Sequence, residues 1–291
     1  MATFADSELI LSPAGAVYHL NLLPFQIAPT VILVGDPDRV AQVSRYFDNI
    51  ECKVQHREFI THTGQLGDKR ISVVSTGIGT DNIDIVINEL DALVNIDLQK
   101  REENNTKTQL TLVRLGTSGA LQEDIAVDSL VASTHGLGID GLMPFYQETE
   151  DQETKALLNS IEEQLPLLKT VAIPYLTRGS ESLLKRLGQG FTAGITLTSP
   201  GFYAPQGRVL RYTPRYKSLL DDARAVVAGH YRITNFEMET AGIYGLAHLL
   251  GHEALSVNAI IANRASKTFS ANPAKTIDFM IQTLLERIRV S

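Results

Sequence analysis

The 291-residue sequence contains a single cysteine, Cys52, so no intramolecular disulfide can form and no cysteine-based metal site can be built. It also lacks an excess of basic residues, because 26 Lys and Arg stand against 33 Asp and Glu. A net charge of −7 gives no general attraction for nucleic acid or for an anionic membrane. No apolar run approaches the ~18–20 residues that span a bilayer, and the N-terminal stretch lacks the pattern of a signal peptide. We therefore expect a soluble protein of a reducing, cytoplasmic compartment.

Short β-branched apolar segments alternate with amphipathic segments along the chain. Unbroken apolar segments are typical of strands covered on both faces, and they predict strands at 30–35, 71–76, 111–116, 128–133, 169–176, 194–199 and 254–263. Apolar residues at helical spacing predict helices over 83–94 and 277–288. The polar stretch 95–109 predicts a helix end followed by an exposed loop, inserted in the fold. The alternation predicts an α/β protein with a largely central sheet, organised as one domain over residues 1–291.

Two glutamates, Glu237 and Glu239, flank Met238 just before an apolar helical segment. If this stretch is extended, both carboxylates lie on the same face. Buried carboxylates are costly unless they are paired or hydrogen-bonded. Two interpretations stay open from these residues alone. The acids either cap the N terminus of the helix, or they accept hydrogen bonds from the hydroxyls of a ligand.

Two arginines occupy positions that a structural role explains poorly. Arg39 stands in the first turn of the helix that VGDPDRV begins, where a cation opposes the helix dipole. An anion shared with nearby N–H groups would resolve this conflict; the alternative is a surface arginine paired with Asp36 or Asp38. Arg114 lies within the apolar strand of VRLGTSGAL and needs a buried carboxylate or a bound anion. Arg39, Arg114 and Thr117 together predict a phosphate pocket.

Common nucleotide-binding motifs are absent from the sequence. The turn STGIGTDN carries Gly77 and Gly79, but Asn82 stands where the dinucleotide fingerprint needs its third glycine. The sequence also lacks G-x-x-x-x-G-K-[ST], which excludes a P-loop site. A Rossmann dehydrogenase is therefore disfavoured.

Six motifs, VGDPDRV, QHREF, STGIGT, VRLGTSGA, FYAPQGR and NFEMETAG, resemble those of the uridine phosphorylases in order and spacing. These enzymes belong to the trimer- or hexamer-forming class of the nucleoside phosphorylase superfamily, and the resemblance runs from about Tyr18 to the C-terminal helix. It implies a single three-layer domain with a central mixed, partly barrel-like sheet flanked by helices. It also implies a pentosyltransferase of nucleoside salvage, which converts uridine and phosphate reversibly to uracil and ribose 1-phosphate.

The resemblance implies no metal or organic cofactor, with inorganic phosphate as co-substrate. It implies a homo-oligomer, either a dimer or a hexamer built as a trimer of dimers, whose active sites are shared across the dimer interface. The implied phosphate site comprises Gly35, Arg39, Arg114 and Thr117, with Arg57 from the neighbouring subunit. The implied ribose site comprises Glu237, Met238 and Glu239, with His19 crossing the interface. The implied base site comprises Phe202, Gln206, Arg208, Ile261 and Arg264.

The edge of uracil presents an acceptor, a donor and an acceptor at O2, N3–H and O4. Gln206 across O2 and N3, with Arg208 at O4, would satisfy this edge and reject bases that lack it. The purine enzymes and related nucleosidases place an aspartate after the late strand to protonate N7. Asn263 stands at that place here, and an amide cannot supply a proton, so the sequence favours uridine.

Several alternatives remain beside uridine phosphorolysis. They are a purine nucleoside phosphorylase, a nucleosidase that uses water, and a non-enzymatic nucleoside-binding protein of the same fold. Three arginines, Arg39, Arg57 and Arg114, argue against a nucleosidase, because water needs no cations to hold it. Asn82 departs from the family at a position that can help to hold a monovalent cation at the subunit interface, which leaves that ion in doubt.

Overall fold

A barrel of five strands lies at the centre of the protein in the computed structural model, which describes residues 3–147 and 152–290. The barrel closes because β12 (Tyr231–Glu237) pairs with both β10 (Thr192–Thr198) and β7 (Thr111–Ala120). The remaining two strands, β8 (Leu130–Gly138) and β13 (Glu253–Asn263), lie between β10 and β7. Parallel and antiparallel pairings both occur in the ring. The predicted mixed, partly barrel-like sheet is confirmed.

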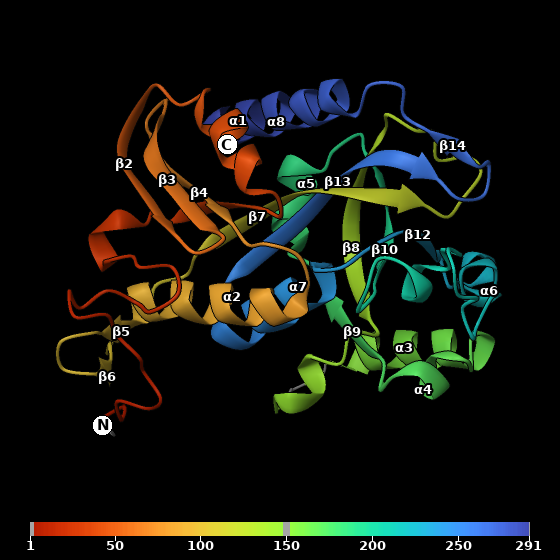
Figure 1. Ribbon diagram of the computed structural model, residues 1–291, viewed down its shortest axis with the longest axis horizontal. Helices are drawn as coiled ribbons and strands as arrows, with labels where there is room; N and C mark the ends of the chain where they lie inside the picture. Colours follow the sequence, from red (N-terminus) through yellow and green to blue (C-terminus); the bar gives the residue numbers. More distant parts are fainter. Residues whose placement is uncertain (1–2, 148–151, 291) are drawn as a thin grey trace.

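An open extension continues the sheet beyond β7 (Figure 1). Its strands in spatial order are β1 (Thr30–Val34), β4 (Lys69–Ser75), β3 (Phe59–Leu66) and β2 (Asn49–His56). The first two run parallel to each other and to β7, whereas β2, β3 and β4 form an antiparallel meander. Short strands β9 (Tyr175–Arg178), β11 (Val227–Ala228) and β14 (Thr268–Phe269) extend β8, β12 and β13. The carboxyl ends of β1, β4 and β7 therefore meet at one edge.

Helices cover both faces of the sheet and make the three layers (Figure 1). One layer holds α2 (Thr80–Asn95), α3 (Gln152–Gln164), α4 (Leu168–Val171) and α7 (Thr240–Leu250). The other holds α1 (Pro37–Ser44), α5 (Glu181–Leu187) and α8 (Pro273–Val290), while α6 (Leu219–Ala225) packs beside β12. Separate apolar clusters fill the space under α2 and α7 and under α1 and α8. None of the helices within the described ranges is long and apolar enough to cross a membrane.

Most of the predicted elements are found, and one is wrong. Strand 169–176 was expected as one unbroken element, but Leu168–Val171 forms helix α4 and the strand begins only at Tyr175. Leu165 and Leu168 are buried three residues apart, which is helical spacing. Pro174 follows and has no N–H to donate to a strand ladder, so pairing starts after it. An apolar run interrupted by proline therefore divides into a helical turn and a short strand.

The meander strands β2 and β3 have no counterpart in the sequence analysis. The residues of β2 are mostly exposed, and β3 contains buried polar residues such as Thr61 and Thr63, so neither strand forms an unbroken apolar segment. The helices predicted at 83–94 and 277–288 lie within α2 and α8. In the stretch 95–109 the helix ends at Asn95 as expected, but a two-stranded sheet of β5 (Ile96–Asp97) and β6 (Glu102–Glu103) follows. The predicted domain limits, residues 1 and 291, lie outside the described residues.

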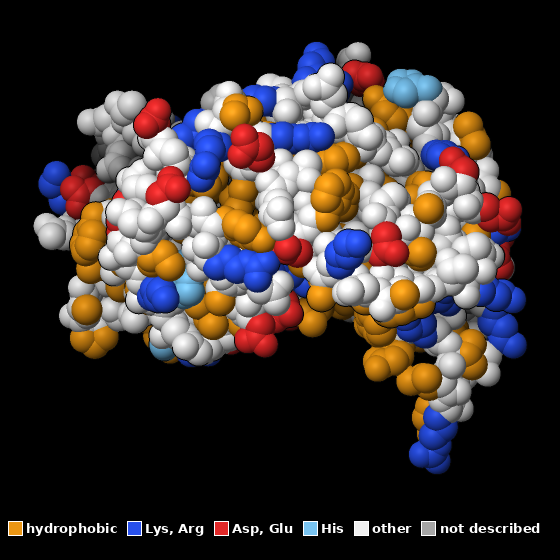
Figure 2. Space-filling model, turned by 90° about the horizontal axis from the view of Figure 1, so that it is seen from above, with side chains coloured by type: hydrophobic (Ala, Val, Ile, Leu, Met, Phe, Trp, Pro, Cys, Tyr) orange, Lys and Arg blue, Asp and Glu red, His pale blue; other side chains and the backbone are white. Residues whose placement is uncertain are grey.

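Acidic and basic side chains are interspersed on the face of the molecule seen in Figure 2. Apolar groups lie between them, and a narrow arm projects from one end of this face. A nucleic-acid-binding face would gather its Lys and Arg along one groove or stripe. The mixture of charges agrees with the net charge of −7.

Candidate active site

A cavity of about 740 Å³ lies at the carboxyl ends of the strands that meet between barrel and extension. Its walls include Gly35 after β1, Gly77 after β4, Thr117 in β7, Glu237 at the end of β12 and Ile261 in β13. Crevices at the carboxyl ends of parallel strands are the usual ligand sites of open α/β sheets. Eleven residues predicted from the sequence line this one cavity, namely Gly35, Arg39, Arg114, Thr117, Phe202, Gln206, Arg208, Glu237, Met238, Glu239 and Ile261.

Arg39 reaches the cavity from the first turn of α1. Its guanidinium is buried, with 8% of the residue exposed, and Nη1 donates to the carbonyl oxygen of Leu115 at 3.3 Å. Burial lowers the pKa of Arg39, although the nearby carboxylate of Asp36 opposes this change. The side chain of Asp36 is engaged with the backbone N–H of Asp38 as the cap of α1. The alternative of a surface arginine is therefore wrong, and a buried cation faces the cavity.

Arg114 forms the centre of a buried ion cluster. Its Nη2 donates to Glu239 Oε2 and lies 3.2 Å from Glu237 Oε2. The three side chains are at most 6% exposed. Burial by itself would lower the pKa of Arg114, but the negative charges of Glu237 and Glu239 outweigh it and raise that pKa. The requirement for a buried carboxylate beside Arg114 is thus met by both glutamates.

The two glutamates have different partners around this cluster. Glu237 accepts hydrogen bonds from the backbone N–H groups of Glu239 and Thr240, each at 2.9 Å, and from the hydroxyl of Thr198. It therefore caps the N terminus of α7. Glu239 accepts from the N–H of Gly79 at 2.8 Å, a glycine with φ of +96° in the turn before α2. Glu239 thus lies between the turn and Arg114 and lines the cavity.

Burial raises the pKa of Glu237 to about 7. The charge of Arg114 opposes this increase, and the neighbouring charge of Glu239 adds to it. A carboxyl with such a pKa changes its charge near neutral pH, here at the wall of the cavity. The charge balance of the ion cluster is therefore sensitive to protons and to any anion that binds nearby.

The base side of the cavity is organised by Arg208. Its Nη1 donates to the carbonyl oxygen of Phe202 at 2.6 Å and to Gln206 Oε1 at 2.5 Å. The guanidinium also stacks 3.6 Å from the centroid of the Phe202 ring. Arg264 does not line the cavity; it donates to the carbonyl oxygens of Gln206 and Gly207 and so holds the turn from behind. Gln206 is 2% exposed, which fixes its amide at the cavity wall.

His19 and Arg57 lie outside this cavity, on a patch that includes Tyr18. The carboxylate of Glu89 accepts from both the backbone N–H and Nδ1 of His19, the latter at 2.7 Å. Because a carboxylate only accepts, Nδ1 of His19 is the donor of this hydrogen bond. Arg57 is exposed in the β2–β3 turn with its guanidinium 5.4 Å from the Tyr18 ring. Tyr18 therefore lies beside both residues, and neither of them lines the cavity of its own chain.

Asn263 ends the late strand β13, where the sequence argument placed it, but its side chain does not line the cavity. Its Nδ2 donates to the carbonyl oxygens of Gln122 and Ile125, and its Oδ1 accepts from the N–H of Ser266. The side chain is used to tie loops together and does not line the cavity. Asn263 therefore gives no direct reason for choosing uracil over a purine, and the base edge rests on Gln206 and Arg208.

Asn82 lines the cavity near Gly77, together with Glu58 and Ile78. No group of three or more His, Cys, Asp or Glu residues that could hold a metal ion occurs within residues 3–147 and 152–290. Wall residues that the sequence analysis did not single out include Glu58, Phe236 and Phe269. Glu58 and Phe236 directly adjoin Arg57 and Glu237, so a wider reading of the motifs QHREF and NFEMETAG would have included them.

Comparisons with known proteins identify the family of this chain. Residues 29–288 match the model of a family described as the phosphorylase superfamily. The chain is 32% identical to a uridine phosphorylase of Thermococcus kodakarensis, over 91% of this chain and 84% of that one. It is 28% identical to a purine nucleoside phosphorylase of Bacillus subtilis, over 82% and 84%. A Trypanosoma brucei nucleoside phosphorylase structure, described as showing uridine phosphorylase activity, superposes with a TM-score of 0.87 at 24% identity, over 97% and 100%. The chain therefore belongs to the phosphorylase superfamily.

Proposed function

We propose that the protein is a uridine phosphorylase. The observation that carries this proposal is the meeting of three kinds of group in one cavity: buried arginines, buried carboxylates, and a glutamine–arginine pair. Arg39 and Arg114 supply positive charge for phosphate, and Glu239 supplies an acceptor for hydroxyls. The cavity volume of about 740 Å³ is within the range of small-molecule sites and leaves room for a nucleoside beside a phosphate.

The reaction exchanges one bond at C1′ of the ribose. The bond from C1′ to N1 of uracil breaks, and its electron pair leaves with the base. A phosphate oxygen forms the new bond to C1′ and gives ribose 1-phosphate. The sugar gains positive charge as the base departs, so an anion held close to C1′ stabilises the transition state. Holding the phosphate is the role of Arg39, Arg114 and Thr117.

The departing base carries negative charge on its carbonyl oxygens. Gln206 offers both an amide N–H and a carbonyl, and Arg208 offers only donors, which matches the acceptor and donor sequence of uracil. Because Phe202 and Gln206 already hold the Arg208 guanidinium, little side-chain freedom is lost when uracil binds. No step of this scheme needs a metal or an organic cofactor.

We infer that the working form is a homo-oligomer with shared sites. His19 and Arg57 form one patch with Tyr18 and do not line the cavity of their own chain, which supports a contribution to a neighbouring subunit. His19 would accept or donate at the ribose 5′-hydroxyl, and Arg57 would add a third cation beside the phosphate. We also propose that the chain is a single domain, because one continuous sheet runs from β2 to β11.

The test is cleavage of uridine followed by ultraviolet absorbance, with and without phosphate, beside inosine under the same conditions. We expect loss of uridine only with phosphate present and no loss of inosine. Cleavage of inosine would assign the protein to the purine enzymes, and cleavage without phosphate would assign it to the nucleosidases. Absence of any cleavage, with nucleoside binding retained in calorimetry, would favour a binding protein.

A further inference from the structure

Arg114 must hold its guanidinium in a fixed place while it shares a cavity with two carboxylates and a ligand anion. A further side-chain hydrogen bond of Arg114 is made with Asn258 in the neighbouring strand β13. Nη1 of Arg114 donates to Oδ1 of Asn258 at 2.9 Å. Asn258 itself is 0% exposed and does not line the cavity. It therefore acts on a ligand indirectly, and Arg114 is its direct contact with the cavity wall.

The strand register explains how the two side chains meet. In the parallel pairing of β7 with β13, Arg114 stands opposite Ser256 and Gly116 stands opposite Asn258. Side chains two residues apart share a face of the sheet, so the guanidinium folds along its own strand over Gly116. A Cβ at Gly116 would lie 1.7 Å from Arg114 Nη1 and 2.6 Å from Asn258 Oδ1. The hydrogen bond between Arg114 and Asn258 therefore requires a residue without a side chain at position 116.

A chain of buried hydrogen bonds fixes Asn258 in turn. Its Nδ2 donates to Ser256 Oγ at 3.2 Å, and Ser256 Oγ lies 2.8 Å from Thr240 Oγ1 at the start of α7. The amide cannot be reversed, because the guanidinium offers only donors and needs the oxygen. The hydroxyl of Tyr244 accepts from the backbone N–H of Ser256 at 2.7 Å and donates to the carbonyl of Ser133. Hydrogen bonds that involve both β13 and α7 therefore fix the position of Asn258.

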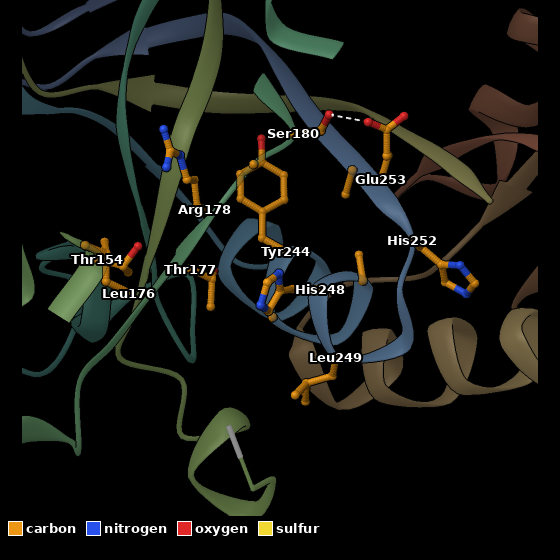
Figure 3. Close-up of a pocket in the computed structure, with 14 residues that line it drawn as sticks. Thr154, Leu176, Thr177, Arg178, Ser180, Tyr244, His248, Leu249, His252 and Glu253 are labelled. Carbon is orange, nitrogen blue, oxygen red and sulfur yellow. Dashed lines mark hydrogen bonds between the residues drawn. The ribbon is translucent and has the colours of Figure 1, made fainter. Parts of the chain in front are cut away.

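Tyr244, the last residue of this series of hydrogen bonds, lines a second cavity of about 370 Å³, which Figure 3 shows. Its ring stands among Thr177, Ser180 and His248, and the dashed line marks the hydrogen bond from Ser180 to Glu253. The polar groups Thr177, Ser180 and Tyr244 all have partners within the protein. These three groups therefore need no ligand in this cavity, and the importance of Tyr244 lies in its hydrogen bond to β13.

We propose that Asn258 is a positioning residue for the phosphate-binding arginine. Its amide oxygen accepts a hydrogen bond from Arg114 and carries no charge. Arg114 already faces two carboxylates, and a third at position 258 would add negative charge that repels a phosphate. An apolar residue would leave a buried N–H without a partner and the guanidinium free to turn toward Glu237. An amide fixes the direction of the cation without reducing its charge. This inference rests on the proposed phosphorolysis.

Two substitutions separate positioning from mere filling of space. Asn258→Asp keeps the size and shape of the side chain but adds a carboxylate. Asn258→Ala removes the acceptor. We expect the KM for phosphate to rise about tenfold or more in both variants, and the KM for uridine to stay within about twofold. If the side chain only fills space, Asn258→Asp keeps the wild-type KM for phosphate and only Asn258→Ala loses stability.

Asn95→Ala is the matched control. Asn95 is also a buried asparagine, 3% exposed, whose amide is engaged with Asp91 and with the backbone of Thr108. Its variant should lose thermal stability and keep the KM for phosphate. Calorimetric titration with phosphate alone gives a second measure that does not depend on turnover. An unchanged phosphate affinity in both Asn258 variants overturns the inference, whereas a wild-type protein without phosphate-dependent cleavage overturns the proposed function instead.

Discussion

The carboxylate of Glu237 lies 3.2 Å from the guanidinium of Arg114, and both side chains are almost completely buried. The same carboxylate caps α7, so the start of the helix and the position of the arginine depend on one group. Glu239, two residues later, completes the ion cluster and lines the cavity. A structural cap and a second buried acid on the cavity wall therefore occur side by side. The capping interpretation describes Glu237, and the ligand interpretation is our proposal for Glu239.

Replacing Arg114 should affect both catalysis and folding. Arg114→Ala removes the cation that we assign to phosphate, and we expect phosphate-dependent kcat/KM to fall at least about 100-fold. It also leaves two buried carboxylates without their partner, so the free energy of unfolding should fall by about 3–5 kcal/mol. Steady-state kinetics and urea unfolding measure the two effects. Arg232→Ala, which breaks an exposed pair with Asp124, serves as control and should cost about 1 kcal/mol or less. Near-wild-type turnover of Arg114→Ala at low phosphate would show that the phosphate assignment is wrong.

The pH dependence of stability should report on Glu237. Its pKa is about 7 in the folded protein and about 4.3 for an unperturbed glutamate, so the folded state holds the proton more tightly. The stability that this proton contributes is fully present below about pH 4.3 and is lost as pH rises through 7. Relative to Glu237→Gln, which does not titrate, the wild-type free energy of unfolding should fall by about 1–3 kcal/mol between pH 4.5 and 7.5. Urea unfolding at several pH values measures this difference, and parallel curves for the two proteins would contradict it.

Substitutions on the base side should leave phosphate binding intact. Gln206→Ala and Arg208→Ala remove the groups that we assign to the uracil edge, so the KM for uridine should rise about 10- to 100-fold. The KM for phosphate should stay near its wild-type value, because Arg39 and Arg114 are unchanged. Arg211→Ala is the control, since Arg211 is an exposed arginine three residues further on that does not line the cavity. Kinetics with each substrate varied in turn test the separation, and an equal rise in both KM values would refute it.

Shared sites can be tested by mixing two inactive variants. The His19→Ala variant lacks the histidine that we assign to the site of the neighbouring subunit. The Glu239→Ala variant lacks the hydroxyl acceptor that we assign to the site of its own chain. After joint unfolding and refolding, a mixed dimer should contain one intact site, because Glu239 of one chain meets His19 of the other. We expect activity to return to about a quarter of the wild-type value in an equal mixture. Activity that stays at the level of the separate variants would argue that each chain uses its own His19.

Much of the fold was predictable because its pattern is local. Unbroken apolar segments mark strands buried on both sides, and the strands near 30, 71, 111 and 254 follow from them. The meander strand β2 escaped prediction because it is an exposed edge element without such a pattern. The helical turn at Leu168–Val171 was taken for a strand, since a short apolar run does not distinguish the two by itself.

The sequence by itself determined which chemical groups the protein carries and roughly where its strands end. Arg114 within an apolar strand already required a buried carboxylate or an anion, and the glutamates of NFEMETAG were the evident acids. Tertiary structure alone decided how these groups are shared. Register between β7 and β13 places Asn258 opposite Gly116 and against Arg114, 144 positions away in the sequence. It also turned Asn263 toward loop carbonyls and away from the cavity. The physical reason is that a residue type fixes what a side chain can donate or accept, whereas strand pairing fixes which partner it meets.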